Sequence, residues 1–469
     1  MSTKPVTKMI EDFSNPDKAE ELFKKIREFQ HNPGLSLVDK AVIDAILLIQ
    51  DGKIADAIAK WRSIANIAEG HYDELSAQAW FFVGILLSKR NQEESLSAYD
   101  KAISLKPDYA DAYHNRGNLK NALKQHESAI ADYDEATRIE PNNAAVYTNR
   151  GVTKYLLGQL DSAIIDFNEA IQLKPDDAST HIKRGVAKTE LDQYESAIAD
   201  FNEAIRLKPG DALVYSMRGR AKGSLGQYEA SIADFDETIR LKPEDAETYF
   251  IRGVSKERLG EHESAITDFD ESIRLKPDDA QTYFMRGRAK IKVERYEEAI
   301  ADLDESLQLN PDDTQAYFVR GCAGIELERY EEAINDFNEI IRLKPNNALA
   351  YNNRAHLKNK LGQYESALAD CNESIRLNFD DAWPYANRGL AKVKLGQPES
   401  ALTDCDEAIQ RNPDLAEAYH TRGEAYRLLG KAEKAKADYQ KALELAEEAD
   451  DQDLKTEIEQ SLQELDNTE

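Results

Sequence analysis

The residue types most often used in catalysis and metal binding are few in this sequence, and they are scattered along it. Three cysteines, Cys322, Cys371 and Cys405, and eight histidines occur among 469 residues. No two histidines stand at the spacing of metal ligands on one helix, and no close cysteine pair suggests a zinc site or a disulfide. The sequence also lacks a phosphate-binding glycine loop, a GxSxG motif and an HExxH motif. We therefore expect no catalytic residue, no metal site and no cofactor.

Arginine and aspartate, in contrast, recur at a fixed spacing. An arginine occurs every 34 residues, ten times in succession, and an aspartate follows each arginine by 16 positions. The arginines are Arg116, Arg150, Arg184, Arg218, Arg252, Arg286, Arg320, Arg354, Arg388 and Arg422, and the aspartates are Asp132, Asp166, Asp200, Asp234, Asp268, Asp302, Asp336, Asp370, Asp404 and Asp438.

A guanidinium can donate two parallel hydrogen bonds to one carboxylate, so this pattern predicts a ladder of ion pairs, with Arg218–Asp234 and Arg252–Asp268 among its members. The alternative is a row of cations that binds an acidic ligand. The structural interpretation is favoured because each repeat supplies its own carboxylate.

Helix pairs are the elements that must position these residues. Each 34-residue segment contains a first helix, which carries a tyrosine such as Tyr113 in nine of the ten copies. A glycine such as Gly158 follows this helix in several copies, where a positive φ suits a tight turn. A second helix carries Ala129, Tyr133 and Ala136 on one face, and a proline then ends it. A period of this length is typical of stacked supersecondary units.

These positions resemble the tetratricopeptide repeat. With Ala110 as position 1, the family pattern of an aromatic, glycine, alanine, aromatic, small residue and proline is met by Tyr113, Gly117, Ala129, Tyr133, Ala136 and Pro141. The resemblance implies an all-α fold, a right-handed superhelical solenoid of antiparallel helix pairs. Arginine at position 7 departs from the usual leucine, and position 11 is lysine in eight repeats, a style similar to bacterial and particularly cyanobacterial members. Cys371 and Cys405 replace the aromatic at position 24, so we expect small core residues.

The resemblance also predicts how the chain is divided. Residues 1–36 form an N-terminal helical segment whose Leu22, Phe23, Ile26 and Phe29 share one face, and which either caps the stack or recruits a partner. Residues 37–75 form a degenerate helix pair. Eleven repeats occupy 76–449, of which 76–109 is divergent and 110–449 contains ten regular copies. A capping helix and tail complete the chain at 450–469.

The family's first helices line a concave groove, and the resemblance assigns partner-binding residues to it. The middle repeats place apolar side chains there, and the outer repeats place asparagines; together they are Met217, Phe250, Ile251, Phe284, Met285, Phe318, Val319, Asn115, Asn149, Asn353 and Asn387. An exposed apolar stripe is typical of a binding surface, and asparagine can pair with the backbone of an extended peptide. The alternative is that the phenylalanines pack between adjacent first helices as part of the core.

Charge and composition complete the functional prediction. The net charge of −28 argues against nucleic acid and anionic membranes as partners. No apolar stretch has the length of a membrane span or a signal peptide, so we expect a cytoplasmic protein. The predicted function is a non-catalytic scaffold or adaptor that binds a peptide or helix of a protein partner. The alternative is a recognition or regulatory subunit of an enzyme or defence-effector complex. The repeat pattern specifies no oligomeric state.

Overall fold

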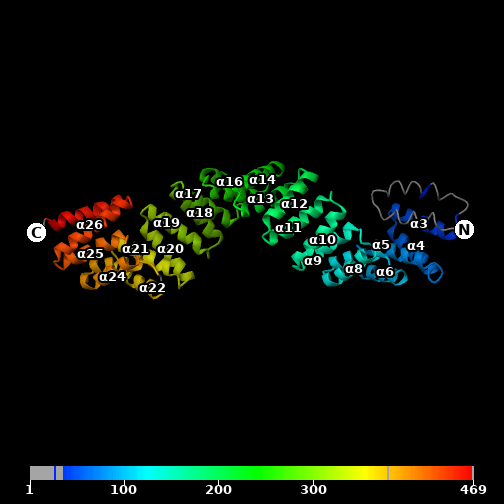
Figure 1. Ribbon diagram of the computed structural model, residues 1–469, viewed down its shortest axis with the longest axis horizontal. Coiled ribbons are helices and arrows are strands. Elements are labelled where there is room, and N and C mark those ends of the chain that lie inside the picture. Colours follow the sequence, from blue (N-terminus) through cyan, green and yellow to red (C-terminus); the bar gives the residue numbers. More distant parts are fainter. Residues whose placement is uncertain (1–25, 28–34, 378–379, 467–469) are drawn as a thin grey trace. The chain divides into compact units, whose positions relative to one another are not determined.

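The structure is a computed structural model that describes residues 26–27, 35–377 and 380–466. Within these ranges all regular elements are helices (Figure 1), and the last of them is α27. They form two compact units, an N-terminal unit (Met1–Leu241) and a C-terminal unit (Lys242–Glu469). In each unit, successive helices pair and the pairs stack on one another. The prediction of an all-α repeat solenoid is confirmed.

The first helix follows an aspartate or asparagine in seven of the ten regular repeats, and in five of them this side chain accepts a hydrogen bond from the start of the helix. In the third repeat, for example, the Asp177 carboxylate accepts a hydrogen bond of 3.2 Å from the backbone N–H of Thr180, one of the groups that a helix start leaves unpaired. The first helices are α7 (Ala110–Ala122), α9 (Ala144–Leu156), α11 (Ala178–Glu190), α13 (Ala212–Ser224), α15 (Ala246–Arg258), α17 (Ala280–Ile291), α19 (Thr314–Glu326), α21 (Ala348–Lys360), α23 (Trp383–Lys394) and α25 (Ala416–Leu428).

The second helix follows a turn with a left-handed residue, as the glycines predicted. Gly158 and Gly226 have φ of 73° and 74°, and Asp192 takes the same region at 56° where a repeat lacks the glycine. The second helices are α8 (His126–Ile139), α10 (Leu160–Leu173), α12 (Tyr194–Leu207), α14 (Tyr228–Leu241), α16 (His262–Leu275), α18 (Tyr296–Leu309), α20 (Tyr330–Leu343), α22 (Tyr364–Arg376), α24 (Pro398–Arg411) and α26 (Ala432–Glu448).

The two helices of a repeat are held together by an aromatic ring that packs on a glycine. Phe269 of α16 is fully buried, and its Cε1 lies 2.7 Å from the place that a Cβ on Gly253 would occupy. Any side chain at that position would overlap the ring, so the glycine is required for the close approach of α15 and α16. The same contact recurs between Gly185 and Phe201.

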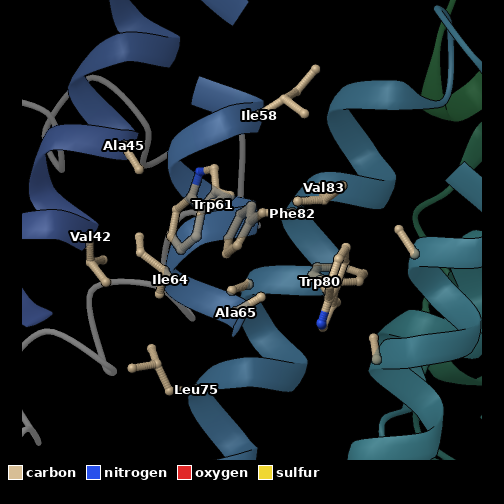
Figure 2. Close-up of a cluster of buried hydrophobic side chains, with 14 of the residues drawn as sticks. Val42, Ala45, Ile58, Trp61, Ile64, Ala65, Leu75, Trp80, Phe82 and Val83 are labelled. Atoms are coloured by element: carbon tan, nitrogen blue, oxygen red, sulfur yellow. The ribbon is translucent and has the colours of Figure 1, made fainter. Parts of the chain in front are cut away.

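Among the described residues of the N-terminal unit, two helix pairs precede the regular repeats. These helices are α3 (Leu37–Gln50), α4 (Ile54–Ala68), α5 (Asp73–Leu87) and α6 (Gln92–Leu105). Their shared core includes Trp61 and Phe82, whose stacked rings lie 4.7 Å apart, together with Leu75 (Figure 2). Ile26 is fully buried in the same cluster. The other members of the predicted N-terminal apolar face, Leu22, Phe23 and Phe29, lie outside the described residues.

The C-terminal unit ends with α27 (Gln452–Asp466), which packs on α26. Ile458 and Leu465 of α27 are buried in a cluster with Tyr439 of α26. An apolar stripe on α27 thus covers the last regular helix pair, as a capping helix must in a stacked array. No helix in the described ranges combines the length and apolar character that crossing a membrane requires.

Candidate functional site

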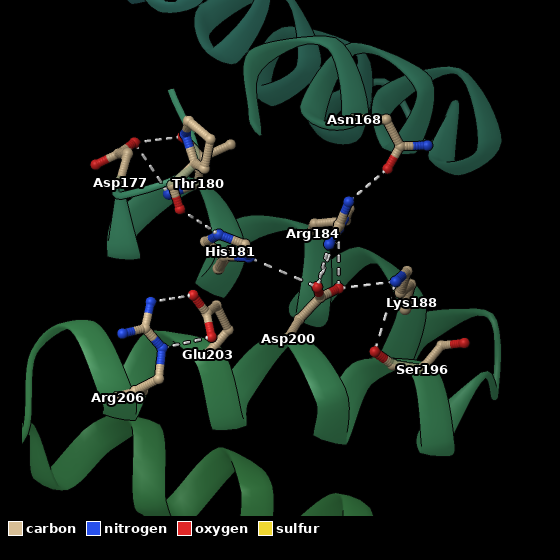
Figure 3. Close-up of polar contacts among 11 residues, drawn as sticks. Asn168, Asp177, Thr180, His181, Arg184, Lys188, Ser196, Asp200, Glu203 and Arg206 are labelled. Atoms are coloured by element: carbon tan, nitrogen blue, oxygen red, sulfur yellow. Dashed lines mark hydrogen bonds and ion pairs between the residues drawn. The ribbon is translucent and has the colours of Figure 1, made fainter. Parts of the chain in front are cut away.

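In nine of the ten regular repeats, the arginine binds two carboxylate or amide groups on two different helices. In the third repeat, Arg184 Nε lies 3.1 and 3.0 Å from the two carboxylate oxygens of Asp200, and its Nη2 donates to the same carboxylate (Figure 3). Its Nη1 donates to Asn168 Oδ1, at 2.7 Å, on the second helix of the preceding repeat. The arginine therefore joins its own helix pair to the previous one.

A lysine completes this network in eight of the ten repeats. Lys188 Nζ lies 2.8 Å from Asp200 Oδ2, and the eight equivalent Nζ–Oδ2 distances range from 2.6 to 2.8 Å. The ten aspartates are only 1–7 % exposed. A carboxylate buried this far requires partners of this kind, because an unpaired charge in the interior is costly.

The arginine also stacks on the tyrosine of its own first helix. In nine repeats the guanidinium carbon lies 5.2–5.5 Å from the ring centroid, which is cation–π range. In the third repeat His181 takes the place of the tyrosine, and its Nε2–H donates to Pro175 O at 3.0 Å. The predicted ladder residues Arg218–Asp234 and Arg252–Asp268 have the same bidentate contact. These cations face carboxylates inside the stack, which favours the structural role over a row of cations for an acidic ligand.

The predicted groove residues of the middle repeats are more buried than expected. Phe284 and Met285 were expected at the surface, and each is only 6 % exposed. Met217, Phe250, Ile251, Phe318 and Val319 are partly buried. The reason is that α17 lies close to both α15 and α19, so its buried side chains share one apolar cluster with residues of those two helices. The alternative of packing between first helices, which concerned the phenylalanines, is favoured for Phe284, and Met285 is buried beside it.

The predicted asparagines of the N-terminal unit bind neighbouring groups of the protein itself. Asn115 Nδ2 donates to Asp111 O at 2.9 Å. Asn149 Nδ2 lies 2.9 Å from both Asn118 Oδ1 and His114 Nε2. Burial lowers the pKa of His114 to about 4, so its ring is neutral at pH 7 and Nε2 can accept this hydrogen bond.

The asparagines of the C-terminal unit behave in a similar way. Asn387 is buried, and its Nδ2 donates to Asn352 Oδ1 at 3.1 Å, while its backbone carbonyl accepts from Asn359 at 2.9 Å. Asn353 is half-buried. The amides of Asn115, Asn149 and Asn387 therefore link neighbouring groups of the stack, and this was not expected from their positions in the repeat.

A pocket of about 450 Å³ opens on the first helices of the C-terminal unit, among α17, α19 and the α20–α21 turn. Three of the predicted groove residues, Phe284, Phe318 and Val319, line it together with Ile340. These four side chains are apolar. The structure thus brings together one compact part of the predicted stripe and leaves Met217, Phe250, Ile251 and Met285 out of the pocket lining.

Polar and cationic groups surround this apolar floor. Lys344 Nζ donates to Thr314 Oγ1 at 2.7 Å, and Arg288 lies over the Phe284 ring with its Cζ 5.8 Å from the centroid. Arg288 also pairs with Glu257 at 3.1 Å. Gln315 and Asn347 complete the polar lining. We call this site the α17–α19 pocket.

Sequence reasoning missed the polar residues of the α17–α19 pocket. Arg288 stands at one of the groove positions of its repeat, and a search for cations at these positions would have found it. Lys344 could not be singled out from the sequence, because it belongs to a Leu-Lys-Pro sequence that recurs at the end of six second helices. Its place at this pocket depends on Thr314, which begins α19 where the other first helices of regular repeats mostly begin with alanine.

Two of the three cysteines, those at position 24 of their repeats, are core residues, as predicted. Cys371 and Cys405 are fully buried, and burial, with neighbouring aspartate charges adding to it, raises the pKa of each thiol to about 12. Such thiols stay protonated at neutral pH and are weak nucleophiles. In the part of the chain that the structure describes, no group of histidine, cysteine and acidic side chains is arranged to hold a metal ion.

Several solved structures are similar to this one. They include MamA, at 23 % identity and a TM-score of 0.35, over 37 % of this chain and 94 % of MamA. YrrB, titled a TPR protein with an unusual peptide-binding site, matches at 21 % identity and a TM-score of 0.37, over 39 % of this chain and 95 % of YrrB. The C-terminal part of a TPR repeat-containing protein from Cytophaga hutchinsonii matches at 18 % identity and a TM-score of 0.46, over 52 % of this chain and 98 % of that chain.

In sequence, the chain has no significant match among curated proteins. Family models described as tetratricopeptide repeats match it at residues 85–123, 117–158, 144–177, 178–211, 216–280, 284–348, 337–369, 384–415 and 416–448. These matches extend over most of the helix pairs that carry the ladder and the glycine–aromatic contact. The chain belongs to the tetratricopeptide-repeat family.

Proposed function

We propose that this protein is a non-catalytic scaffold that binds a peptide or helix of a protein partner at the α17–α19 pocket. Tetratricopeptide repeats are protein-interaction scaffolds, and the finer assignment to this pocket is supported by one observation. The pocket has an apolar floor of Phe284, Phe318 and Val319 and a cationic rim, on the first helices of its unit. Aromatic floors with polar rims are the usual anatomy of a binding hot spot.

The chemistry of the lining indicates what the partner segment carries. Phe318, Val319 and Ile340 favour an apolar side chain, because its burial there removes apolar surface from water. Lys344 and Arg288 favour a carboxylate close to that side chain. The partner segment is therefore expected to place a large apolar residue next to an aspartate, a glutamate or its own terminal carboxylate.

The helices around the pocket are held in place before a ligand arrives. Arg286 of α17 and Arg320 of α19 each bind the aspartate of the same repeat and a residue of the preceding second helix. A surface fixed in this way loses little conformational entropy on binding, which raises affinity. The ladder thus fixes the positions of α17 and α19, and the side chains that line the pocket on these helices select the ligand.

Selection of peptides from a random displayed library tests this function. Peptides selected on the wild-type protein are expected to share an apolar residue beside an acidic one. Gln315 is exposed at the pocket rim, so Gln315→Trp fills the pocket from outside without disturbing the core. We expect the selected peptides to bind this variant at least about tenfold more weakly, measured by fluorescence polarisation.

Gln281→Trp provides the matched control. Gln281 stands at the same repeat position as Gln315, one repeat earlier, and is exposed without lining the pocket. Binding to this variant should equal binding to the wild type. Peptides that bind all three proteins equally, or a shared basic motif among the selected peptides, would contradict the proposal.

A further inference from the structure

The lysine of the ladder is replaced in two repeats, and the two replacements differ. At the position where eight repeats have the lysine, the last repeat has Tyr426, a bulky side chain that packs on the cluster around Tyr439. The seventh regular repeat has Gly324, which has no side chain. Gly324 lies inside α19 with an ordinary helical backbone, so neither a turn nor a positive φ explains the glycine there.

A cavity of about 250 Å³ lies where this lysine side chain is missing. Gly324, Ile300 and Ala333 line it, together with Asp336, the ladder aspartate of this repeat. A Cβ added at Gly324 would lie 3.6 Å from Ala333 Cβ, an ordinary contact, so packing does not require the glycine. The cavity therefore lies beside the ladder aspartate, at the position that the lysine side chain occupies in eight other repeats.

Asp336 has lost one of its two cationic partners. In the eight repeats with the lysine, the Oδ2 of the ladder aspartate has an ammonium nitrogen at 2.6–2.8 Å. Asp336 Oδ2 has Arg320 Nε at 3.2 Å, and the same Nε lies 3.1 Å from Oδ1. The residue is 5 % exposed, so water compensates little for the missing ammonium.

The surrounding charges also favour a cation. Asp304 and Glu332 line the cavity beside Asp336, and among the described residues of the lining Arg320 alone is cationic. Burial, with the charges of Asp304 and Glu332 adding to it, raises the pKa of Asp336 although Arg320 opposes this. Three carboxylates therefore face one guanidinium, whereas a bound ammonium would bring the local charges closer to balance.

We propose that this cavity binds a primary alkylammonium group, either a lysine side chain of a partner protein or a free alkylamine. The ammonium donates to Asp336 Oδ2 as the ladder lysines do, and the methylene chain lies against Ile300 and Ala333. The eight lysines of the chain itself show the geometry of the complex. The cavity shares no lining residue with the α17–α19 pocket, so it is a second binding site of a different chemistry.

Titration with n-butylamine at pH 7, where it is an ammonium ion, tests the site on the full chain by saturation-transfer NMR. Gly324→Lys supplies the missing side chain and is expected to weaken binding at least about tenfold, because the ligand's place is then filled. Gly324→Ala leaves most of the cavity open and should bind like the wild type. Neutral n-butanol should not compete with n-butylamine.

A gain of binding complements this loss. Lys222→Gly removes the ladder lysine of another repeat, whose Nζ lies 2.8 Å from Asp234, and should add a second n-butylamine site. Equal binding of n-butylamine to the wild type and to Gly324→Lys would overturn the proposal, as would binding of n-butanol as tight as that of n-butylamine.

Two further probes distinguish a lysine side chain of a partner protein from a free alkylamine as the source of the ammonium group. Tighter binding of acetyl-Gly-Lys-Gly-amide than of 1,4-diaminobutane supports a partner's lysine, and the reverse order supports a free amine.

Discussion

Replacing Asp234 by alanine is expected to lower the free energy of local unfolding around α13 and α14 by about 3–5 kcal/mol. Asp234 accepts two hydrogen bonds from Arg218, with Nε at 2.9 Å and Nη2 at 2.5 Å, and Lys222 Nζ lies 2.8 Å from its Oδ2. The two cationic side chains are each 17 % exposed. Removing the carboxylate leaves both positive charges largely buried and without their shared partner, so the effect exceeds that of an exposed salt bridge.

Amide hydrogen exchange measures this effect where it occurs. A stacked array opens in parts, so the exchange rates of α13 and α14 report the local free energy better than a single melting temperature. Glu229→Ala is the control, since it removes the same charge from an exposed position of the same helix. The control should change the free energy of local opening, derived from the exchange rates, by less than about 0.5 kcal/mol. An Asp234→Ala variant with the exchange of the wild type would contradict the structural role of the ladder.

Replacing Trp61 by alanine is expected to destabilise the α4–α5 region by about 3–5 kcal/mol. Trp61 is fully buried and stacks on Phe82, so its loss leaves a large cavity in the core of the first helix pairs (Figure 2). Trp61→Phe should cost much less, within about 1 kcal/mol, because the indole Nε1 is buried with no hydrogen-bond partner among the described residues. Phenylalanine keeps a ring against Phe82 and removes that unsatisfied donor.

Urea unfolding followed by circular dichroism compares these two variants, and hydrogen exchange of α4 and α5 locates the change. The expected order of stability is wild type close to Trp61→Phe, with Trp61→Ala far below both. If Trp61→Phe were as unstable as Trp61→Ala, the indole nitrogen would have a stabilising partner that the described contacts do not include. The account of this core as simple apolar packing would then be wrong.

The regular part of the fold could be predicted from the sequence because every repeat contains the same residues at the same positions. Gly158 and Gly226 indicated the left-handed turn between helices. Gly253 stands at the glycine position of the family pattern, and Phe269 packs on it. The spacing of Arg218 and Asp234 indicated their pairing. Each of these contacts lies within one repeat, so the period alone is enough to infer it.

Contacts between repeats could not be read from the same pattern. The period gives no direct measure of how closely adjacent first helices approach, and that distance decides whether Phe284 is exposed or buried. The period also did not predict that the Asn149 side chain would hydrogen-bond with Asn118 and His114 of the preceding repeat. The α17–α19 pocket likewise depends on the sizes of side chains from three different helices.

Both proposed binding sites arise where one repeat departs from the others. Thr314 stands at the start of α19 and binds Lys344 at the rim of the α17–α19 pocket. Gly324, in the same helix, removes the ladder lysine and leaves the cavity beside Asp336. In an array of nearly identical repeats, residues that interrupt the pattern without a packing reason are therefore the first candidates for function.

Photo-crosslinking tests the proposed function most directly. A selected peptide that carries benzoylphenylalanine in place of its apolar anchor is bound to the wild-type protein, irradiated and mapped by mass spectrometry. The proposal predicts crosslinks to α17 and α19 around Phe284, Phe318 and Val319, and their loss in the Gln315→Trp variant. Crosslinks that fall on the second helices or on α3 to α6, and that persist in this variant, would contradict binding at the α17–α19 pocket.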